Sequence, residues 1–215
     1  KESIGVMLGY VDMVRGMPNL KQVNLHFPPK RWRDEAQLEG HEGTYDRMID
    51  GFRQIARKAE ENGIEIVLEN GNAHWTGIRD DITADQVDWQ DRNWAFGASP
   101  EEWVGICIDI DRPNVGLCLD SSHLATYSHT VADDEKRMRV ALSFLDKPEL
   151  IRHVHWNDNF LYDTRGRIDQ HAILGKGTLP VSIHRSIKDL DATLHLEHFY
   201  TIKDLEEELV YIQEL

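Results

Sequence analysis

The sequence predicts an α/β protein with a (β/α)8 TIM-barrel architecture. Short runs that suit β-strands alternate with longer stretches that suit helices, which is typical of repeated βα units and a parallel sheet. Five strands are expected, at residues 22–27, 64–69, 115–120, 151–156 and 192–197. A closed barrel of eight strands needs about 250 residues. We therefore expect this chain of 215 residues to lack the N-terminal βα units of its barrel.

Helices are expected between and around these strands. They cover residues 1–17, 44–61, 100–110, 133–146, 181–189 and 203–214. Asn62-Gly63 ends the second helix, and Ser99-Pro100 with Glu102 predicts the start of the third, with a capping box. No repeat, low-complexity tract or linker interrupts the sequence, so residues 1–215 are predicted to form a single domain.

The connection between residues 71 and 98 is much longer than the others. It carries His74, Trp75, Trp89 and Trp94. Loops of this length in compact domains tend to be lids or binding loops. The alternative is a small decoration packed by its own tryptophans, and the sequence leaves both open.

The composition describes an acidic, soluble protein. The chain has 38 Asp and Glu against 24 Lys and Arg, a formal charge of −14, and 40% of its residues are hydrophobic. No stretch approaches the roughly 18 apolar residues of a spanning helix, and no secretory pattern opens the chain, so we expect a cytoplasmic protein without a membrane partner. The charge weakens, without excluding, binding to a nucleic acid. Cys107 and Cys118 form no CxxC pair, which predicts neither a disulfide framework nor a thiolate zinc site.

Polar residues recur on one parity of the predicted strands. Side chains alternate between the two faces of a strand, so one parity meets the helices and the other points into the barrel. At or near the carboxyl ends of the strands, where barrels of this type build active sites, the inward parity carries His26, Glu69, Asp120, His155 and Glu197. Buried carboxylates repel one another unless a cation neutralises them. The pattern therefore predicts a divalent metal, and mixed imidazole and carboxylate ligands suit Zn²⁺, Mn²⁺, Co²⁺ or Fe²⁺, with Mg²⁺ possible.

Taken singly, each of these residues has an ordinary structural interpretation. Glu69 and Glu197 could be strand-end acids that face solvent, and His155 could be a core histidine with its hydrogen bonds satisfied. Asp120 could cap the turn after its strand. Their joint occurrence at equivalent strand positions favours a shared site.

Several segments carry a resemblance to a known family. They are Leu68-Glu69-Asn70, Leu119-Asp120-Ser121-Ser122-His123, His153-Val154-His155-Trp156-Asn157-Asp158, Asp169-Gln170-His171 followed by Gly175-Lys176-Gly177, and Leu196-Glu197-His198. In this order and spacing they resemble the xylose isomerase-like TIM barrels. That superfamily joins sugar and sugar-phosphate isomerases and epimerases to the endonuclease IV type of abasic-site DNA nuclease. The resemblance runs from about His26 to Glu197, most of the chain.

The resemblance implies a set of metal ligands. A shared divalent metal, Zn, Mn, Co or Mg, would be held by Glu69, Asp120, His155 and Glu197. The nuclease branch binds three zinc ions, and its two flanking metals would be held by His26 for one and by His123, Asp169 and His171 for the other. That branch has a further histidine on the strand before the one carrying His26, and this sequence has no counterpart of it.

We rank a sugar or sugar-phosphate isomerase or epimerase first. Such an enzyme removes a proton next to a carbonyl and returns one at a neighbouring carbon or on the opposite face. A metal that polarises the carbonyl makes this proton more acidic, and Glu69 and Glu197, from well-separated strands, suit the roles of base and acid. His123 would orient a hydroxyl of the small-molecule substrate. Lys176 in the Gly175-Lys176-Gly177 turn would contact a phosphate of the substrate. The alternative is a plain turn with no role in binding.

The alternative is an endonuclease IV-like phosphodiesterase that acts at abasic sites in DNA. Clustered zinc ions would generate hydroxide and clamp the phosphate. Arg31 and Arg33 are candidates for DNA contacts, although acidic neighbours dilute their charge. The net charge and the number of isomerase-like members of the superfamily favour the sugar enzyme, and a barrel that binds a ligand without turnover is a third possibility.

Overall fold

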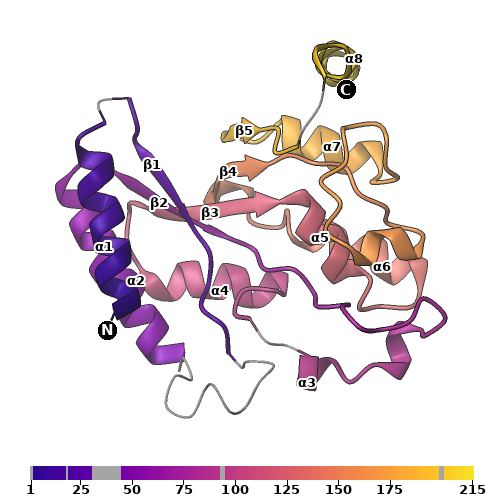
Figure 1. Cartoon of the computed structure of the whole chain (residues 1–215), viewed down its shortest axis with the longest axis horizontal. Coiled ribbons are helices and arrows are strands. Elements are labelled where there is room, and N and C mark those ends of the chain that lie inside the picture. Colours follow the sequence, from indigo (N-terminus) through magenta and orange to yellow (C-terminus); the bar gives the residue numbers. More distant parts are fainter. Residues whose placement is uncertain (1, 18, 31–44, 93–94, 199–200) are drawn as a thin grey trace.

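Five parallel strands form the centre of the molecule (Figure 1). The structure is a computed structural model, and it describes residues 2–17, 19–30, 45–92, 95–198 and 201–215. The strands are β1 (Gln22–Leu25), β2 (Glu65–Glu69), β3 (Val115–Asp120), β4 (Ile151–His155) and β5 (Thr193–His195), and they lie side by side in sequence order. They curl into a half-barrel, which confirms the predicted fold class. Because all five are parallel, their carboxyl ends meet at one edge.

Helices follow each strand, as predicted. They are α1 (Glu2–Arg15), α2 (Tyr45–Glu61), α3 (Trp89–Arg92), α4 (Pro100–Ile110), α5 (Ser121–Ser128), α6 (Asp134–Ser143), α7 (Val181–Lys188) and α8 (Ile202–Glu214). Short 3₁₀ turns add η2 (Ala84–Gln86), η3 (Pro148–Leu150) and η4 (Thr164–Arg167). Only α3 and α5 have no counterpart among the predicted helices. No helix of the described residues is both long enough and apolar enough to cross a membrane.

Helix α4 begins where the sequence predicted, with one difference. The Ser99 hydroxyl accepts a hydrogen bond from the Glu102 N–H at 3.2 Å, and Pro100 occupies the first helical position. The Glu102 carboxylate does not return to Ser99, because it accepts the Gly97 N–H at 2.9 Å instead. Half of the predicted capping box therefore forms, and its second half holds the end of the preceding loop.

The hydrophobic core lies between the sheet and its covering helices. Leu68, Leu117 and Leu119 bring the outward parity of the strands against Trp103 and Ile106 of α4, and all five are fully buried. Figure 1 shows α2 and α4 running along this side of the sheet. The predicted parity therefore holds for β2 and β3, whereas in β5 the predicted core-facing Leu194 is 39% exposed.

A bulge in β4 sets which of its residues face inward. The register between β3 and β4 shifts at Arg152, so that Ile151 and Val154 both join the core although they are three residues apart. The Arg152 side chain crosses the inner face beside Gly116, where an added Cβ would lie 2.6 Å from its Cδ, and donates to Glu65 at 2.6 Å. This ion pair forms a layer of the inner face toward the amino ends of the strands.

Candidate metal centre

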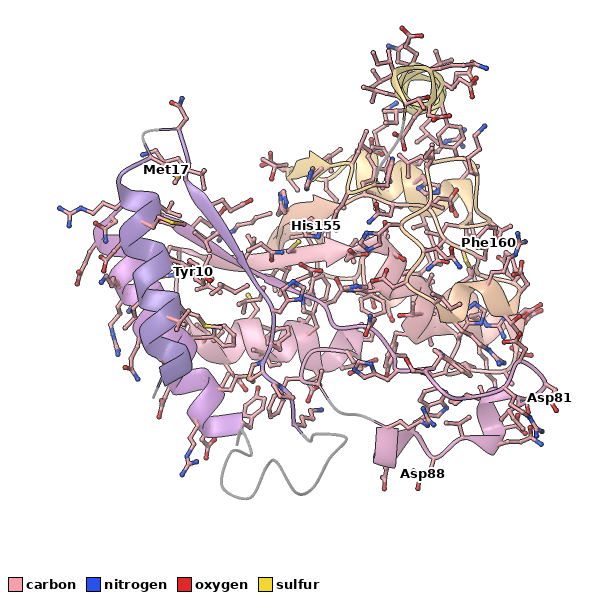
Figure 2. The ribbon with its side chains drawn as sticks, viewed as in Figure 1. Tyr10, Met17, Asp81, Asp88, His155 and Phe160 are labelled. Atoms are coloured by element: carbon pink, nitrogen blue, oxygen red, sulfur yellow. The ribbon has the colours of Figure 1, made fainter. Side chains whose placement is uncertain are left out.

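Four of the predicted ligands converge at the carboxyl edge of the sheet. The Nδ1 atom of His155 lies 2.9 Å from Glu197 Oε2, 3.5 Å from Glu69 Oε2 and 3.7 Å from Asp120 Oδ2. Glu69, Asp120 and His155 are the last residues of β2, β3 and β4, and Glu197 follows β5 by two residues. Figure 2 labels His155 near the middle of the molecule, beside the ends of these strands. Strands far apart in the sequence thus deliver one imidazole and three carboxylates to one point.

Several polar atoms at this point are buried without a hydrogen bond. Among the described residues, no hydrogen-bond partner exists for Asp120 Oδ2, His155 Nδ1, His171 Nε2 or Glu197 Oε2. An unsatisfied buried polar atom costs about 1–3 kcal/mol, and more when it is charged. Divalent cations take carboxylate and imidazole donors of this kind, and one donor atom each of Glu69, Asp120 and His155 lies within 4.8 Å of the others. The residues present therefore fit a metal ion.

Asp120 serves two purposes with its two oxygens. Oδ1 accepts the N–H groups of Ser122 at 2.7 Å and His123 at 3.0 Å, and so caps α5. Oδ2 points to the unsatisfied cluster. The capping interpretation is therefore right, and it leaves the second oxygen available to a ligand.

Asn70 holds this strand end in place. Its side chain accepts the Asp120 N–H at 2.6 Å and donates to the Asp120 carbonyl at 3.1 Å, while its own carbonyl lies 2.8 Å from His123 Nδ1. Sequence reasoning assigned no role to Asn70. Its position directly after Glu69, at the end of an apolar strand, is the signal that would have indicated one.

A second donor group adjoins the first. Asp169 lies 3.0 Å from His123 Nε2 through one oxygen and 3.0 Å from His171 Nε2 through the other. One donor atom each of Asp120, His123, Asp169 and His171 falls within 4.8 Å of the rest, a spacing that a metal ion can bridge. His171 adopts φ of +42° and places Nδ1 3.0 Å from the Glu197 carbonyl. The three residues that the resemblance grouped together do lie together, with Asp120 shared between the two groups.

His26 lies at the rim of the cluster. Its Nε2 is 3.3 Å from Glu69 Oε2, but 71% of its side chain is exposed. The Asn24 amide donates to the same oxygen of Glu69, which is itself buried, so the solvent-facing interpretation of Glu69 is wrong. His26 joins the centre only through Glu69.

The surplus of carboxylates sets the charge of the histidines. Burial lowers the pKa of His155, but contacts with Asp120, Cys118 and Glu69 outweigh it and raise the pKa to about 12. Likewise Asp120 and Asp169 overcome burial and raise the pKa of His123 to about 10, and a hydrogen bond with Asp169 raises that of His171 to about 9. These imidazoles hold protons at neutral pH, so a metal ion that binds them must displace protons.

The long connection after β2 packs on its own tryptophans and also borders the centre. The Trp75 and Trp89 rings meet edge to face at 4.6 Å, and Trp75 donates to the Thr126 carbonyl at 3.1 Å. Trp94 lies outside the described residues. A cavity of about 470 Å³ opens beside this connection and is lined in part by Asn72, Thr126 and Asp169. The interpretation as a decoration packed by its own tryptophans is therefore right in part, and the role of a lid or binding loop stays a prediction.

The glycine turn does not place its lysine at the centre. The N–H groups of Gly175 and Gly177 both donate at 2.9 Å to Oδ2 of Asp158. Lys176 points outward, with 61% of its side chain exposed and its Nζ 3.6 Å from Glu207. The plain-turn interpretation is the better one. Arg31 and Arg33 lie outside the described residues.

The last helix reaches the strand end that carries Glu197. The buried Glu208 of α8 accepts the Leu174 N–H at 2.8 Å and lies 3.0 Å from His198 Nε2. The other ring nitrogen of His198 is 3.1 Å from Asn157 Oδ1. The residue next to Glu197 is thereby fixed on two sides.

The chain belongs to the xylose isomerase-like TIM barrel family, whose sequence profile matches residues 6–215. The match agrees with the half-barrel and with the polar strand ends described above.

Individual relatives are more distant. The uncharacterized protein MJ1311 of Methanocaldococcus jannaschii is 25% identical over 156 residues, which cover 71% of this chain but only 43% of that protein. A D-tagatose 3-epimerase-like protein superposes with a TM-score of 0.60 at 22% identity, over 98% of this chain and 70% of that one. An IOLI protein crystallised with a zinc atom superposes with a TM-score of 0.60 at 16% sequence identity, over 97% of this chain and 68% of that one. At these identities the structural likeness shows a shared fold.

Proposed function

We propose that this chain forms the metal-binding part of a sugar or sugar-phosphate isomerase or epimerase. The observation that carries the proposal is the set of buried, unsatisfied atoms that three strand ends and the segment after β5 bring to one point. Family membership supports it, since a fold relative is described as D-tagatose 3-epimerase-like and another was crystallised with zinc.

Glu69, Asp120, His155 and Glu197 would hold the divalent metal. When bound, such an ion polarises a substrate carbonyl and makes the neighbouring C–H proton more acidic. His171 and His123, joined through Asp169, border the ligands on the side of the cavity that Asp169 lines. A cavity of about 470 Å³ is within the usual size of small-molecule sites, about 300–1,000 Å³.

Glu69 and Glu197 supply the proton transfers of the proposed reaction. They approach the common point from β2 and from beyond β5, so a substrate between them would meet one carboxylate on each side. One carboxylate takes the proton from the carbon next to the carbonyl, and the other, as the acid, returns a proton to the opposite face or to the neighbouring carbon. His123 orients a substrate hydroxyl.

Replacing Glu197 tests this assignment. Glu197→Gln keeps the shape of the side chain but removes its basicity, and we expect at least about a hundredfold loss of kcat. The assay is a panel of ketoses and their phosphates, followed by chromatography after incubation with Zn²⁺, Mn²⁺, Co²⁺ or Mg²⁺. Glu206→Gln, on the exposed side of α8, is the matched control and should retain full activity. Wild-type activity in Glu197→Gln would refute the role of this carboxylate.

A nuclease of the endonuclease IV type remains the second candidate, because the His123–Asp169–His171 group adds donors beside the first centre. Cleavage of an abasic-site duplex with three metal ions bound per chain would favour this candidate. Epimerisation with one metal ion per chain would exclude it. Both outcomes are read from the same purified protein by elemental analysis and the substrate panel.

A further inference from the structure

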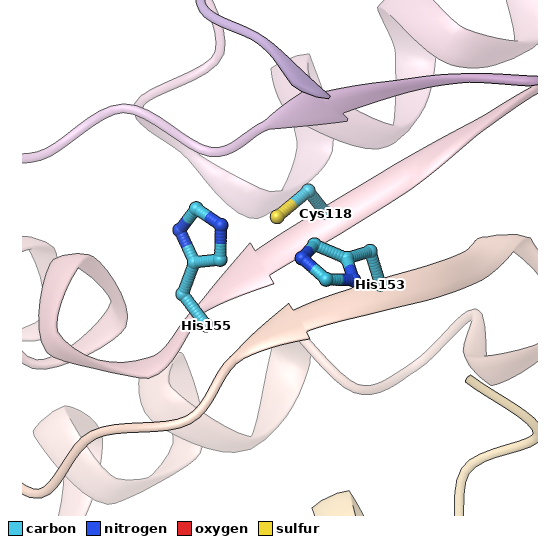
Figure 3. A group of neighbouring side chains, drawn as sticks. All are labelled: Cys118, His153 and His155. Carbon is cyan, nitrogen blue, oxygen red and sulfur yellow. The ribbon is translucent and has the colours of Figure 1, made fainter. Parts of the chain in front are cut away.

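A thiol and two imidazoles lie together on the inner face, one layer toward the amino ends of the strands from the carboxylates. We call Cys118, His153 and His155 the thiol–imidazole group (Figure 3). The sulfur of Cys118 and one nitrogen of each histidine all lie within 4.8 Å of one another. Of the three residues, only His155 belongs to the proposed catalytic centre.

Strand register creates this group. Cys118 of β3 and His153 of β4 are direct partners across the sheet, and Asp120 and His155 are the next such pair. Side chains at alternate positions of a strand share a face, so His153 and His155 both point inward beside the sulfur. The linear sequence separates Cys118 from His153 by a helix pair, and for this reason no short-range cysteine spacing reveals the group.

In His153 and His155, one ring nitrogen faces a partner outside the thiol–imidazole group and the other faces the group. Nδ1 of His153 lies 2.5 Å from the Thr193 hydroxyl, which leaves Nε2 for the group. Nδ1 of His155 faces the carboxylates, and Figure 3 shows a ring nitrogen of His155 turned toward the sulfur of Cys118. Outer partners of this kind fix the orientation of an imidazole that binds a metal.

The charged residues around the thiol–imidazole group favour the binding of a cation. Glu69 is the register partner of Cys118 on β2, so a buried carboxylate adjoins the sulfur on one side. On the other side, toward the amino ends of the strands, the Arg152–Glu65 ion pair closes the layer. His153 is only half-buried and gives the group its contact with solvent.

We propose that the thiol–imidazole group is a second metal site, for a thiophilic ion of the Zn²⁺ and Co²⁺ class. One thiolate with two imidazoles suits these ions and not Mg²⁺, which prefers oxygen ligands. Binding replaces the S–H proton of Cys118 and the proton on the facing ring nitrogen of His155 by bonds to the metal, and releases both protons to solvent. The site shares the ring of His155 with the carboxylate centre, so occupation of one site changes the affinity of the other.

Cobalt absorption tests the site without any enzyme assay. Titration of the metal-free protein with CoCl₂ should produce a sulfur-to-cobalt charge-transfer band in the near ultraviolet. Oxygen and nitrogen ligands alone give no such band. Cys118→Ser should abolish it. Cys107→Ser is the matched control, since this second buried cysteine packs in α4 with its sulfur 3.9 Å from the Val115 carbonyl, and it should leave the band unchanged.

Two further variants separate this site from the proposed catalytic centre. His153→Gln should weaken the cobalt affinity read from the band by about tenfold or more, in line with the loss of a supporting ligand. Glu69→Gln should abolish turnover and keep the band. Circular dichroism confirms that each variant is folded. Absence of the band in the wild-type protein, or its persistence in Cys118→Ser, would overturn the second site and leave the proposed function untouched.

Discussion

Two buried aspartates at the carboxyl edge of the sheet are treated in opposite ways by their surroundings. Asp158 receives a backbone N–H on every side: Asn159 and Leu179 donate to Oδ1, and Gly175 and Gly177 donate to Oδ2. Asp120 is equally buried, but only its Oδ1 accepts hydrogen bonds. Burial alone therefore does not distinguish the two carboxylates. The unsatisfied oxygen of Asp120 is the additional feature on which the proposed metal site rests.

The largest effect on stability is expected at Asp158, whose carboxylate accepts hydrogen bonds at both oxygens. Asp158→Asn places an NH₂ group against two of the four N–H donors in either orientation of the amide. We expect a loss of about 3–5 kcal/mol in the free energy of unfolding, because hydrogen bonds to charged groups contribute about 1.5–3 kcal/mol each. Urea denaturation measures it, with the exposed Asp191→Asn as the control. An equally small change in both variants would contradict the structural role of Asp158.

Metal binding at the carboxylate centre should stabilise the folded protein. Zinc at about a hundredfold excess over its Kd should stabilise the protein by about 2.7 kcal/mol. The gain at a fixed zinc concentration should be larger at pH 8 than at pH 6, because protonated imidazoles compete with the metal. Thermal unfolding with zinc and with EDTA checks this. Asp120→Asn should lose the part of the gain that the carboxylate centre contributes, whereas an unchanged gain in that variant would separate Asp120 from the metal.

Without metal, the same centre should make stability fall as the pH rises. The pKa values of His171 and His123, about 9 and about 10, lie above the value of about 6.5 in an unfolded chain. The folded protein therefore binds the extra protons, and their contribution is complete below about pH 6.5 and is lost as the pH passes 9 and 10. We therefore expect the free energy of unfolding in EDTA to fall between pH 7 and pH 10, measured by denaturation. Stability that is constant or rises over this range would contradict the charged state of these histidines.

The smallest effect on stability is expected from the lysine side chain of the glycine turn. Lys176→Ala removes an exposed ion pair, and such pairs contribute about 0–1 kcal/mol. Gly177→Ala should cost far more, because the added Cβ would lie 2.3 Å from the Asp158 carboxylate. Comparing the two variants by denaturation, with turnover of a phosphorylated ketose as a second measurement, distinguishes a structural turn from a phosphate site. A selective loss of activity on the phosphorylated substrate in Lys176→Ala would restore the phosphate interpretation.

The sequence was informative wherever a repeating period governs the structure. Alternation along the five strands predicted the sheet, the inward parity and the convergence of Glu69, Asp120, His155 and Glu197. The Ser99-Pro100 signal predicted the first residue of α4, because capping chemistry is local.

Features that depend on pairing between strands could not be predicted in this way. The bulge at Arg152 and the meeting of Cys118 with His153 are consequences of register, which no single segment encodes. Helix α5 was missed because it begins at Ser121 with no linker after β3, and its cap is the same Asp120 that reads as a strand end. The difference between Asp158 and Asp120 likewise rests on N–H groups from segments about 20 residues away, as Gly175 and Gly177 illustrate.

The contact between Glu208 and His198 connects the last helix to the chain segment that carries Glu197. Figure 1 shows α8 standing apart from the sheet, yet its one fully buried carboxylate holds the residue adjoining Glu197. A substitution of Glu208 would remove this contact with His198, the residue next to Glu197, although α8 itself lies away from the strands. Under the proposed function, turnover should therefore depend on a buried residue of the last helix as well as on the strand ends.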